Sequence, residues 1–382
     1  MREGWTYKKL GDYIKEYSVK NKVGKDIPVY SVTNSQGFCK EYFSKEVASQ
    51  DKTSYKIVPY GFFAFNPSRI NVGSVDWQHK EEEVIVSPLY NVFSVSENIL
   101  QPYLLYYLKS PATIKYIDSI ATGTVRLNLK LSMLKDFSIP LPSLSEQQSI
   151  VAELDKINEL ISLKKAQLSD LDALAQSIFY DMFGDPIENE KGWEVKKLGE
   201  VCDVRDGTHD SPQYLSESEY FLITSKNIQG DIIDYANVNY ISKEDYDSIN
   251  KRSYVDEGDI IMGMIGTIGK PIIVHKNNLK FCVKNVALIK FPESCLVKNV
   301  YVKALLDNDS YKQYLLSLNK GGTQKFVALG TLRTLKCPLP PLSLQQDFAK
   351  RIELIEQQKA QISSTIKDLE TLLASRMQYW FD

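Results

Sequence analysis

The chain has 382 residues, 43% of them apolar and 25% charged, a composition that excludes a disordered or low-complexity chain and fits two or three folded domains. Its 46 Lys and Arg side chains are matched by 48 Asp and Glu, so the formal charge of -2 excludes attraction of the whole surface to nucleic acid; such a role needs local basic patches or a partner. Five cysteines without close spacing favour reduced thiols, and we expect a cytoplasmic chain with neither a signal peptide nor a membrane span.

The sequence contains one unit twice. GWTYKKLGDYI at residues 4–14 returns as GWEVKKLGEVC at 192–202, and PLPSLSEQQ at 140–148 returns as PLPPLSLQQ at 338–346. Because both borders recur in the same order, they indicate an internal duplication whose second copy is about ten residues longer. The interiors are dissimilar, so we expect them to determine what each copy selects.

Between its borders each copy has the pattern of short strands with a few helices. In chain order we expect strands with a turn at residues 60–75, broken apolar runs at 220–241, and a strand, a Gly-rich turn and a strand at 258–274. Helical stretches at 101–118 and 299–318 each precede a Gly-Thr loop. The pattern predicts α+β domains with a curved sheet.

A long helix is predicted after each Pro-rich border, where apolar residues recur at alternating steps of four and three. We place capping boxes at Ser145 with Gln148 and at Ser343 with Gln346, and we expect Gly184 and Pro186 to end the first helix. The predicted seam consists of Ile150, Leu154, Ile157, Ile161, Leu168, Leu171 and Ile178 in the first helix and Phe348, Ile352, Ile355, Ile362, Ile366, Leu369 and Leu373 in the second.

Two arrangements can bury these seams. Either each helix lies on its own domain, or the two pack against each other; the narrow seam and a length of roughly 57 Å favour mutual packing. An antiparallel pair would set the two domains at opposite ends of a rod, related by an approximate two-fold axis.

No catalytic or metal-binding template fits the chain. FNPS at 65–68 lacks the second proline and the aromatic residue of an amino-methyltransferase loop, and GMIGTIGK at 263–270 lacks the spacing of a phosphate-binding loop. His79, His209 and His275 share no ligand spacing. We therefore expect neither a catalytic site nor a metal site.

The candidate site residues are polar side chains in Gly-containing loops, which suit contacts to base edges and phosphates. Arg and Lys suit guanine, and Asn and Gln suit adenine. The candidates are Asn66, Ser68, Arg69, Asn71, Thr124, Arg126 and Asn128 in the first copy and Thr224, Ser225, Lys226, Asn227, Thr267, Lys270, Thr323, Gln324 and Lys325 in the second.

Over essentially its full length the chain resembles the specificity subunit of a Type I restriction-modification system. The resemblance is carried by the two borders, LPSLSEQQSIVAELDKI and LPPLSLQQDFAKRIELI, and by FNPSRINVGS, FLITSKNIQGDIID and GDIIMGMIGTIGKPIIV. The second border departs from the family pattern, because it has Leu344 where Glu is expected.

The resemblance implies an α+β fold: two pseudo-symmetric globular α/β target-recognition domains joined by two long antiparallel coiled-coil helices. The domains would span 1–142 and 185–340, and the helices 143–184 and 341–382. Each domain would read half of a bipartite double-stranded DNA target, and the helices would set the spacer. No cofactor is expected in this chain. Its partners would be two methyltransferase subunits with S-adenosylmethionine and two restriction subunits that use ATP and Mg.

Two other classes stay open. The chain could be a coiled-coil protein-interaction scaffold with duplicated binding domains, or an enzyme with its own methyl-transfer site. A DNA mobility shift in the presence of the methyltransferase subunit separates the first class from a specificity subunit. Binding of S-adenosylmethionine to the isolated chain favours the second.

Overall fold

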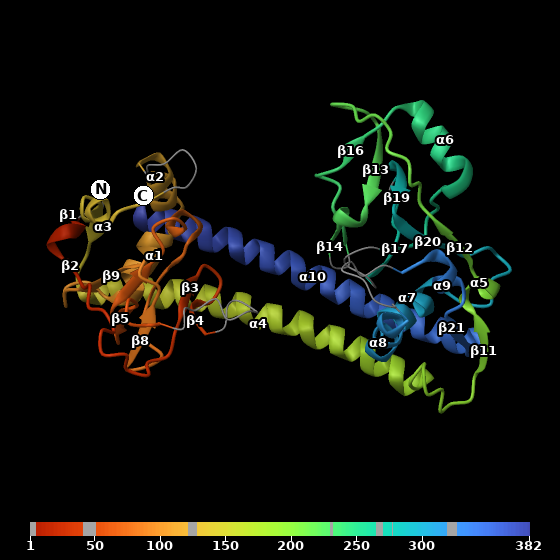
Figure 1. Ribbon diagram of the computed structural model, residues 1–382, viewed down its shortest axis with the longest axis horizontal. Helices are drawn as coiled ribbons and strands as arrows, with labels where there is room; N and C mark the ends of the chain where they lie inside the picture. The colour runs from red at the N-terminus through yellow and green to blue at the C-terminus, as the bar shows by residue number, and fades with distance from the viewer. Residues whose placement is uncertain are drawn as a thin grey trace. The chain divides into compact units, whose positions relative to one another are not determined.

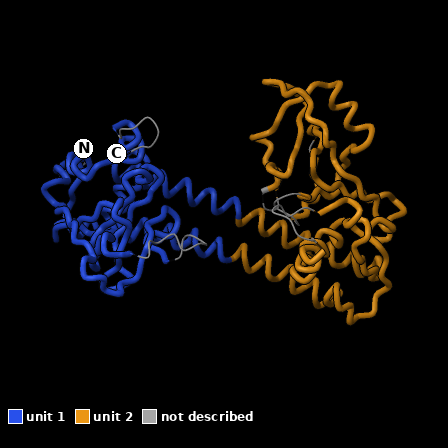
Figure 2. Tube along the Cα trace, in the orientation of Figure 1, with its two compact units in different colours: residues 1–166, 363–382 blue, residues 167–362 orange. Residues whose placement is uncertain are grey.

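The computed structural model describes residues 5–40, 51–120, 128–229, 232–264, 270–276, 278–318 and 327–382. Contacts divide the chain into two compact units, which Figures 1 and 2 show. Unit 1 is Met1–Ala166 with Ser363–Asp382, and unit 2 is Gln167–Ile362. Helices α4 (Leu144–Phe183) and α10 (Leu342–Phe381) have 40 residues each. Each unit therefore contains a part of both helices.

Unit 1 is built on an antiparallel four-stranded sheet with the strand order β2-β9-β6-β7. Its strands are β2 (Ile14–Glu16), β9 (Asn91–Val95), β6 (Phe63–Phe65) and β7 (Val75–Trp77). Three further pairs are β1 (Thr6–Lys9) with β10 (Ser138–Leu141), β3 (Ser31–Thr33) with β4 (Gly37–Cys39), and β5 (Lys56–Pro59) with β8 (Glu83–Val86). The helices are α1 (Gln101–Lys109), α2 (Pro111–Ile120) and α3 (Leu131–Lys135), with 3-10 turns η1 (Leu10–Asp12) and η2 (Ile70–Val72).

Unit 2 repeats this plan. Its antiparallel sheet has the order β12-β20-β17-β18, formed by β12 (Asp203–Asp206), β20 (Val286–Lys290), β17 (Ile260–Gly263) and β18 (Pro271–Ile273). The pair β11 (Glu194–Lys197) with β21 (Lys336–Leu339) matches β1 with β10. The helices of this plan are α5 (Leu198–Val201), α7 (Asn299–Asp307), α8 (Asp309–Ser317) and α9 (Leu329–Arg333). The duplication seen in the sequence is thus present in the strand order.

A second group of elements distinguishes unit 2. Strand β13 (Tyr220–Thr224) lies parallel to β19 (Lys280–Lys284) and antiparallel to β16 (Asn239–Tyr240). Turn η3 (Ser225–Asn227), the pair β14 (Ile228–Gln229) with β15 (Ile232–Ile233), and helix α6 (Lys243–Ser253) complete the group. The strand, turn and strand expected at 258–274 are confirmed as paired strands β17 and β18, with residues 265–269 of the turn outside the described residues.

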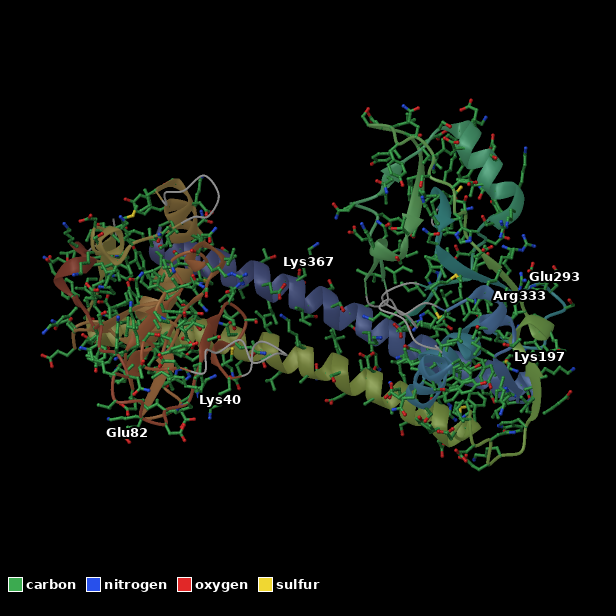
Figure 3. All side chains as sticks on the ribbon, viewed as in Figure 1. Lys40, Glu82, Lys197, Glu293, Arg333 and Lys367 are labelled. Carbon is green, nitrogen blue, oxygen red and sulfur yellow. The ribbon has the colours of Figure 1, made fainter. Side chains whose placement is uncertain are left out.

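The two long helices pack on each other in unit 1. Ile150 and Leu154, near the start of α4, share a buried core with Met377 and Phe381, near the end of α10. Charged residues flank this seam: Arg376 is paired with Glu153, and Lys165 with Glu370 at 3.0 Å between Nζ and Oε1. Lys367, which lies off the seam on α10, is exposed (Figure 3).

In unit 2 the opposite ends of the same helices meet. The ring of Phe348, near the start of α10, lies 5.9 Å from that of Phe179 and 5.1 Å from that of Phe183, at the end of α4. Lys359 occupies a seam position and pairs with Asp172 at 2.8 Å. The mutual antiparallel packing of the helices is therefore confirmed, and every predicted seam residue is buried or half-buried.

The ends of α4 are set by local chemistry. Ser143 is the residue before the helix: its Oγ accepts from the Glu146 amide at 3.3 Å, and the Glu146 carboxylate accepts from the Ser143 amide at 3.0 Å. The capping box expected at Ser145 is therefore wrong by two residues, because the helix begins directly after Pro142 and Ser143. In the second copy Pro341 takes the place of Ser143, and Ser343 lies inside α10. Gly184, with φ +76°, follows the last residue of α4, as expected.

One buried glutamine joins each globular part to its helix. The Gln147 amide is fully buried; its Nε2 donates to the carbonyls of Asn98 and Pro142, and its Oε1 accepts from the amide of Leu100. Gln345 makes the same three bonds, to the carbonyls of Leu296 and Pro340 and the amide of Lys298. The border motif thus holds the start of α1 or α7 against a long helix.

We predict that Gln147→Leu lowers the free energy of unfolding by about 2 kcal/mol, because it leaves buried backbone groups without partners. Gln148→Leu, at the exposed neighbouring position, is the matched control and should change little. Urea denaturation followed by circular dichroism measures both. Equal midpoints for the two variants would show that the buried amide contributes nothing.

Candidate nucleic-acid interface

In unit 1 the connection from β6 to β7 carries four candidate residues. Asn66 Oδ1 accepts from the amide of Ser68, and the Asn66 carbonyl accepts from the amide of Arg69, both at 3.0 Å. This turn leaves the side chains of Ser68 and Arg69 exposed. Asn71 Nδ2 donates to Asp118 Oδ1 on α2 at 3.0 Å, so the connection is fixed to a helix as well as to the sheet.

The segment after the Gly-Thr loop joins this connection. The amide of Leu129 donates to the carbonyl of Pro67 at 3.0 Å, which brings exposed Asn128 beside the turn. Unit 2 repeats the contact: the amide of Val327 donates to the carbonyl of Met264 at 3.0 Å. In each copy the structure therefore brings together two short segments that are some 60 residues apart in the sequence. Exposed Lys270 begins the return to β18. Six candidates lie outside the described residues: Thr124, Arg126, Thr267, Thr323, Gln324 and Lys325.

The candidates in η3 divide into two kinds. Lys226 is exposed and Ser225 is half-buried. Asn227, by contrast, is 4% exposed; its Oδ1 accepts from the amide and hydroxyl of Thr224, and its Nδ2 donates to the carbonyls of Asp234 and Asn237. Asn227 and Thr224 thus stabilise the turn through their own hydrogen bonds. Lys226 and Ser225 are the two η3 side chains that are available for contact with a ligand.

Three strands of unit 2 end at the junction of β19 and β20. The ends of β12 and β17 pair with Ala287 and Val286, at the start of β20. The end of β13 pairs with Lys284, at the end of β19. The segments that follow these strands therefore start around residues 284–286. One is η3, one starts at Met264, and the third is the loop of residues 207–211.

The third loop was missed in the sequence. It contains His209, whose Nε2 lies 2.9 Å from Asp206 Oδ2 and whose Nδ1 lies 2.8 Å from Asn285 Oδ1. Arg252 on α6 also pairs with Asp206. These residues are far apart in the chain, and His209 has no partner at ligand spacing, so no sequence signal could have found the cluster.

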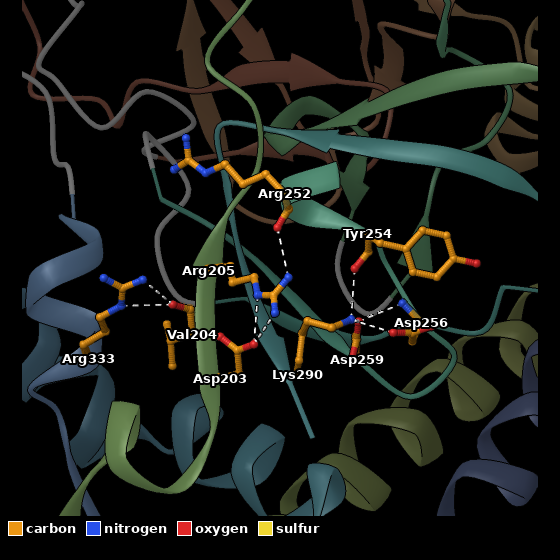
Figure 4. A network of polar contacts seen from close by, with 9 residues as sticks. All are labelled: Asp203, Val204, Arg205, Arg252, Tyr254, Asp256, Asp259, Lys290 and Arg333. Atoms are coloured by element: carbon orange, nitrogen blue, oxygen red, sulfur yellow. Dashed lines mark hydrogen bonds and ion pairs between the residues drawn. The ribbon is translucent and has the colours of Figure 1, made fainter. Parts of the chain in front are cut away.

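A polar network fixes the elements behind this loop (Figure 4). Arg333 donates from Nε and Nη2 to the carbonyl of Val204, and Arg205 donates to Asp203 and to the carbonyl of Arg252. Strand β12 is thereby tied to α9 and to the end of α6, which hold Asp206 and Arg252 in place.

The pKa values of His209 and Asp206 are both shifted. The hydrogen bond with Asn285, and then that with Asp206, raise the pKa of His209 above its ordinary value. Burial would raise the pKa of Asp206, but its bond with His209 and the charge of Arg252 outweigh burial and leave it lowered. Both shifts favour an imidazolium paired with a carboxylate.

Within the described residues, no group of three or more His, Cys, Asp or Glu side chains could hold a metal ion. No helix there combines the length and apolar character needed to cross a membrane. The five cysteines are free, with Cys202 Sγ 3.9 Å from Cys295 Sγ.

Comparison with known proteins identifies the family. The family described as "Type I restriction modification DNA specificity domain" matches residues 2–173 and 190–371. The chain belongs to this family and carries two copies of its domain. A chain with two DNA specificity domains has two recognition domains, and the alternative of a protein-interaction scaffold is not favoured.

Individual relatives agree with this assignment. The MjaIX specificity subunit of a Type I restriction enzyme from Methanocaldococcus jannaschii is 27% identical over 277 residues, 67% of this chain and 62% of that protein. The chain thus spans less than two thirds of that relative. A putative MjaX specificity subunit from the same organism is 24% identical over 388 residues, 93% of this chain and 87% of that protein.

Two solved structures share the fold. The S subunit from M. genitalium has a TM-score of 0.53 at 16% identity, and the alignment covers 99% of this chain and 96% of that one. A chain from a type I R-M system described for complex assembly and conformational transition has a TM-score of 0.58 at 18% identity, with 99% and 97% covered.

We predict that the pKa of His209, followed by NMR titration of the ring protons, lies above its ordinary value of about 6.5 and falls in Asp206→Asn. Because the folded-state pKa is raised, the stabilisation is complete below about pH 6.5 and is lost as the pH rises through the folded-state pKa. His209→Gln assigns the signal. An unshifted pKa, or one unaffected by Asp206→Asn, would contradict this pairing.

Proposed function

We propose that this chain is the sequence-reading subunit of a Type I restriction-modification complex, and that each unit reads one half of a bipartite double-stranded DNA target. The observation that carries the proposal is the pair of matched specificity domains, which share the strand order of their four-stranded sheets. Target-recognition domains at 1–142 and 185–340, with helices at 143–184 and 341–382 as the spacer, complete the proposal.

Catalysis belongs to the partners in this proposal. Two methyltransferase subunits bring S-adenosylmethionine, and two restriction subunits use ATP and Mg, in the cytoplasm. The chain has a formal charge of only -2, which gives it no overall attraction to DNA phosphates. In this proposal the partner subunits therefore supply much of the contact to phosphates. Binding of S-adenosylmethionine to the purified chain alone would contradict a non-catalytic role.

The proposed contact residues are the exposed members of the loops: Ser68, Arg69 and Asn128 in unit 1, and Lys226 and Lys270 in unit 2. Asn66, Asn71, Thr224 and Asn227 form or anchor the loops that carry them. Ser225 and the six candidates outside the described residues stay predictions.

The direct test is single-molecule sequencing of methylated adenines in a host that expresses this chain with its methyltransferase subunits. We expect one motif of two specified halves separated by an unspecified spacer. Methylation that lacks a bipartite motif, or that persists without this chain, would overturn the proposal.

Lengthening both helices tests the spacer. We predict that one heptad added to α4 and one to α10, each near the boundary between the units, keeps the seam in register and lengthens the spacer by about three base pairs. Seven residues add about 10.5 Å of helix, and a base pair rises about 3.4 Å. The two half-sites should stay the same. A changed half-site with the old spacer would contradict the role of the helices.

Removing one cation from a contact loop should weaken binding of the assembled methyltransferase complex to target DNA. If the side chain neutralises one phosphate, Arg69→Ala or Lys270→Ala should also reduce the slope of log affinity against log salt by about 0.9. Lys8→Ala and Lys197→Ala, which remove exposed charges from strands outside the loops, are the matched controls. Wild-type affinity and slope in the first pair would exclude those residues from the interface.

A further inference from the structure

The loop of residues 207–211 in unit 2 is held rigidly against the junction of β19 and β20. The amide of Gly207 donates to the carbonyl of Val286, and that of Thr208 to the carbonyl of Val283, both at 2.9 Å. A Cβ on Gly207 would lie 2.4 Å from the Val283 oxygen, so only glycine fits there. The amide of Asn285 donates in return to the carbonyl of Thr208 at 3.2 Å.

This backbone places three polar side chains in one row: Asp206, His209 and Asn285. The Asp206 carboxylate is 10% exposed and accepts from both Arg252 and His209, whereas the His209 side chain is 61% exposed. Asn285 is half-exposed and adopts the left-handed φ of +55°, which turns its side chain toward the His209 ring. Among the described residues, Nδ2 of Asn285 has no hydrogen-bond partner.

Protonation of His209 decides which end of the Asn285 amide faces the ring. In the imidazolium both ring nitrogens donate, so Asn285 Oδ1 is held toward the ring and Nδ2, on the other side of the amide, is free to donate elsewhere. Deprotonation leaves the hydrogen on Nε2, which Asp206 accepts, and turns Nδ1 into an acceptor. The amide then favours the reverse orientation, with Nδ2 toward the ring and Oδ1 away from it. The end of the Asn285 amide that faces away from the ring therefore changes from a donor to an acceptor.

We propose that His209 positions the amide of Asn285 for hydrogen bonding to DNA in unit 2, and that the complex binds its target more tightly when His209 is protonated. This inference rests on the proposed function. It is carried by the place of the cluster: the 207–211 loop leaves β12 where β13 and β17 also end, and turn η3, which directly follows β13, holds the candidate contact residue Lys226.

Charged groups lie at the His209 ring and at the end of its loop. Asp206 on β12 favours its protonated form, and Arg252 on α6 opposes it. Lys284 on β19 donates from Nζ to Ser211 Oγ, at the end of the same loop. His209 has an ordinary pKa of about 6.5, and its pKa is raised here, so the ring changes charge near neutral pH.

The experiment measures target affinity of the assembled methyltransferase complex between about pH 6 and about pH 9. If target binding raises the pKa of His209 by about one unit, wild-type affinity falls about tenfold as the pH rises through that range. With His209→Gln this pH dependence should disappear. His275→Gln is the matched control. His275 is also exposed and paired with a carboxylate, that of Glu257, but it follows the last residue of β18, whereas Lys270 precedes the first. It should keep the wild-type profile.

A double-mutant cycle tests whether His209 acts through Asn285. At the lower pH, His209→Gln should weaken binding in the wild-type background and have no further effect in Asn285→Ala. Additive effects, or the same pH profile in wild type and His209→Gln, would overturn the inference while leaving sequence-specific binding, and so the proposed function, intact. Loss of sequence-specific binding by the wild-type complex at every pH would overturn both.

Discussion

The structure depends on the burial of one narrow apolar seam that neither long helix can cover alone. In unit 1, Ile150 and Leu154 of α4 close their core with Met377 and Phe381 of α10, and in unit 2 Phe179 and Phe183 of α4 close theirs with Phe348 of α10. Each unit is therefore completed by the helix of the other copy. Removal of the last turns of α10 would expose the core of the N-terminal unit, so the stabilities of the two copies are linked through the duplication itself.

The join between sheet and helix repeats with the same chemistry. The Tyr103 and Tyr301 hydroxyls donate to the carbonyls of Pro140 and Pro338, at corresponding positions of the two borders. Together with the buried glutamines, these bonds fix each globular part to its own stretch of helix. A buried polar group with all its partners satisfied holds one geometry, because every displacement leaves an unpaired donor or acceptor. A stiff join suits the spacer role that we propose for the helices, since movement at the join would vary the distance between the two half-sites.

The sequence was sufficient for the repeat, the two helices and their seam, because hydrophobic periodicity over 40 residues and two recurring borders are long-range signals. The cap of α4 was missed by two residues because both Ser143 and Ser145 fit the local pattern, and only the start of the helix distinguishes them. Asn227 matched a base-reading pattern, yet it is buried in its own turn. The cluster of His209 and Asn285 depends on the register of β12 against β20, which Asn285 directly precedes, and periodicity does not determine register.

The two units keep one scaffold and differ in the loops that leave it. After β2 in unit 1, Asn21 is fully buried and both ends of its amide bond the backbone of Lys25. After β12, at the same place in the sheet order, unit 2 has the exposed His209. The loop after β2 is closed by hydrogen bonds between an uncharged amide and its own backbone. In the loop after β12, the titratable ring of His209 bonds Asp206 on β12 and Asn285 between β19 and β20. Protonation of His209 would therefore act on bonds that hold the loop of unit 2, whereas the Asn21 bonds in the corresponding loop of unit 1 involve no titratable side chain.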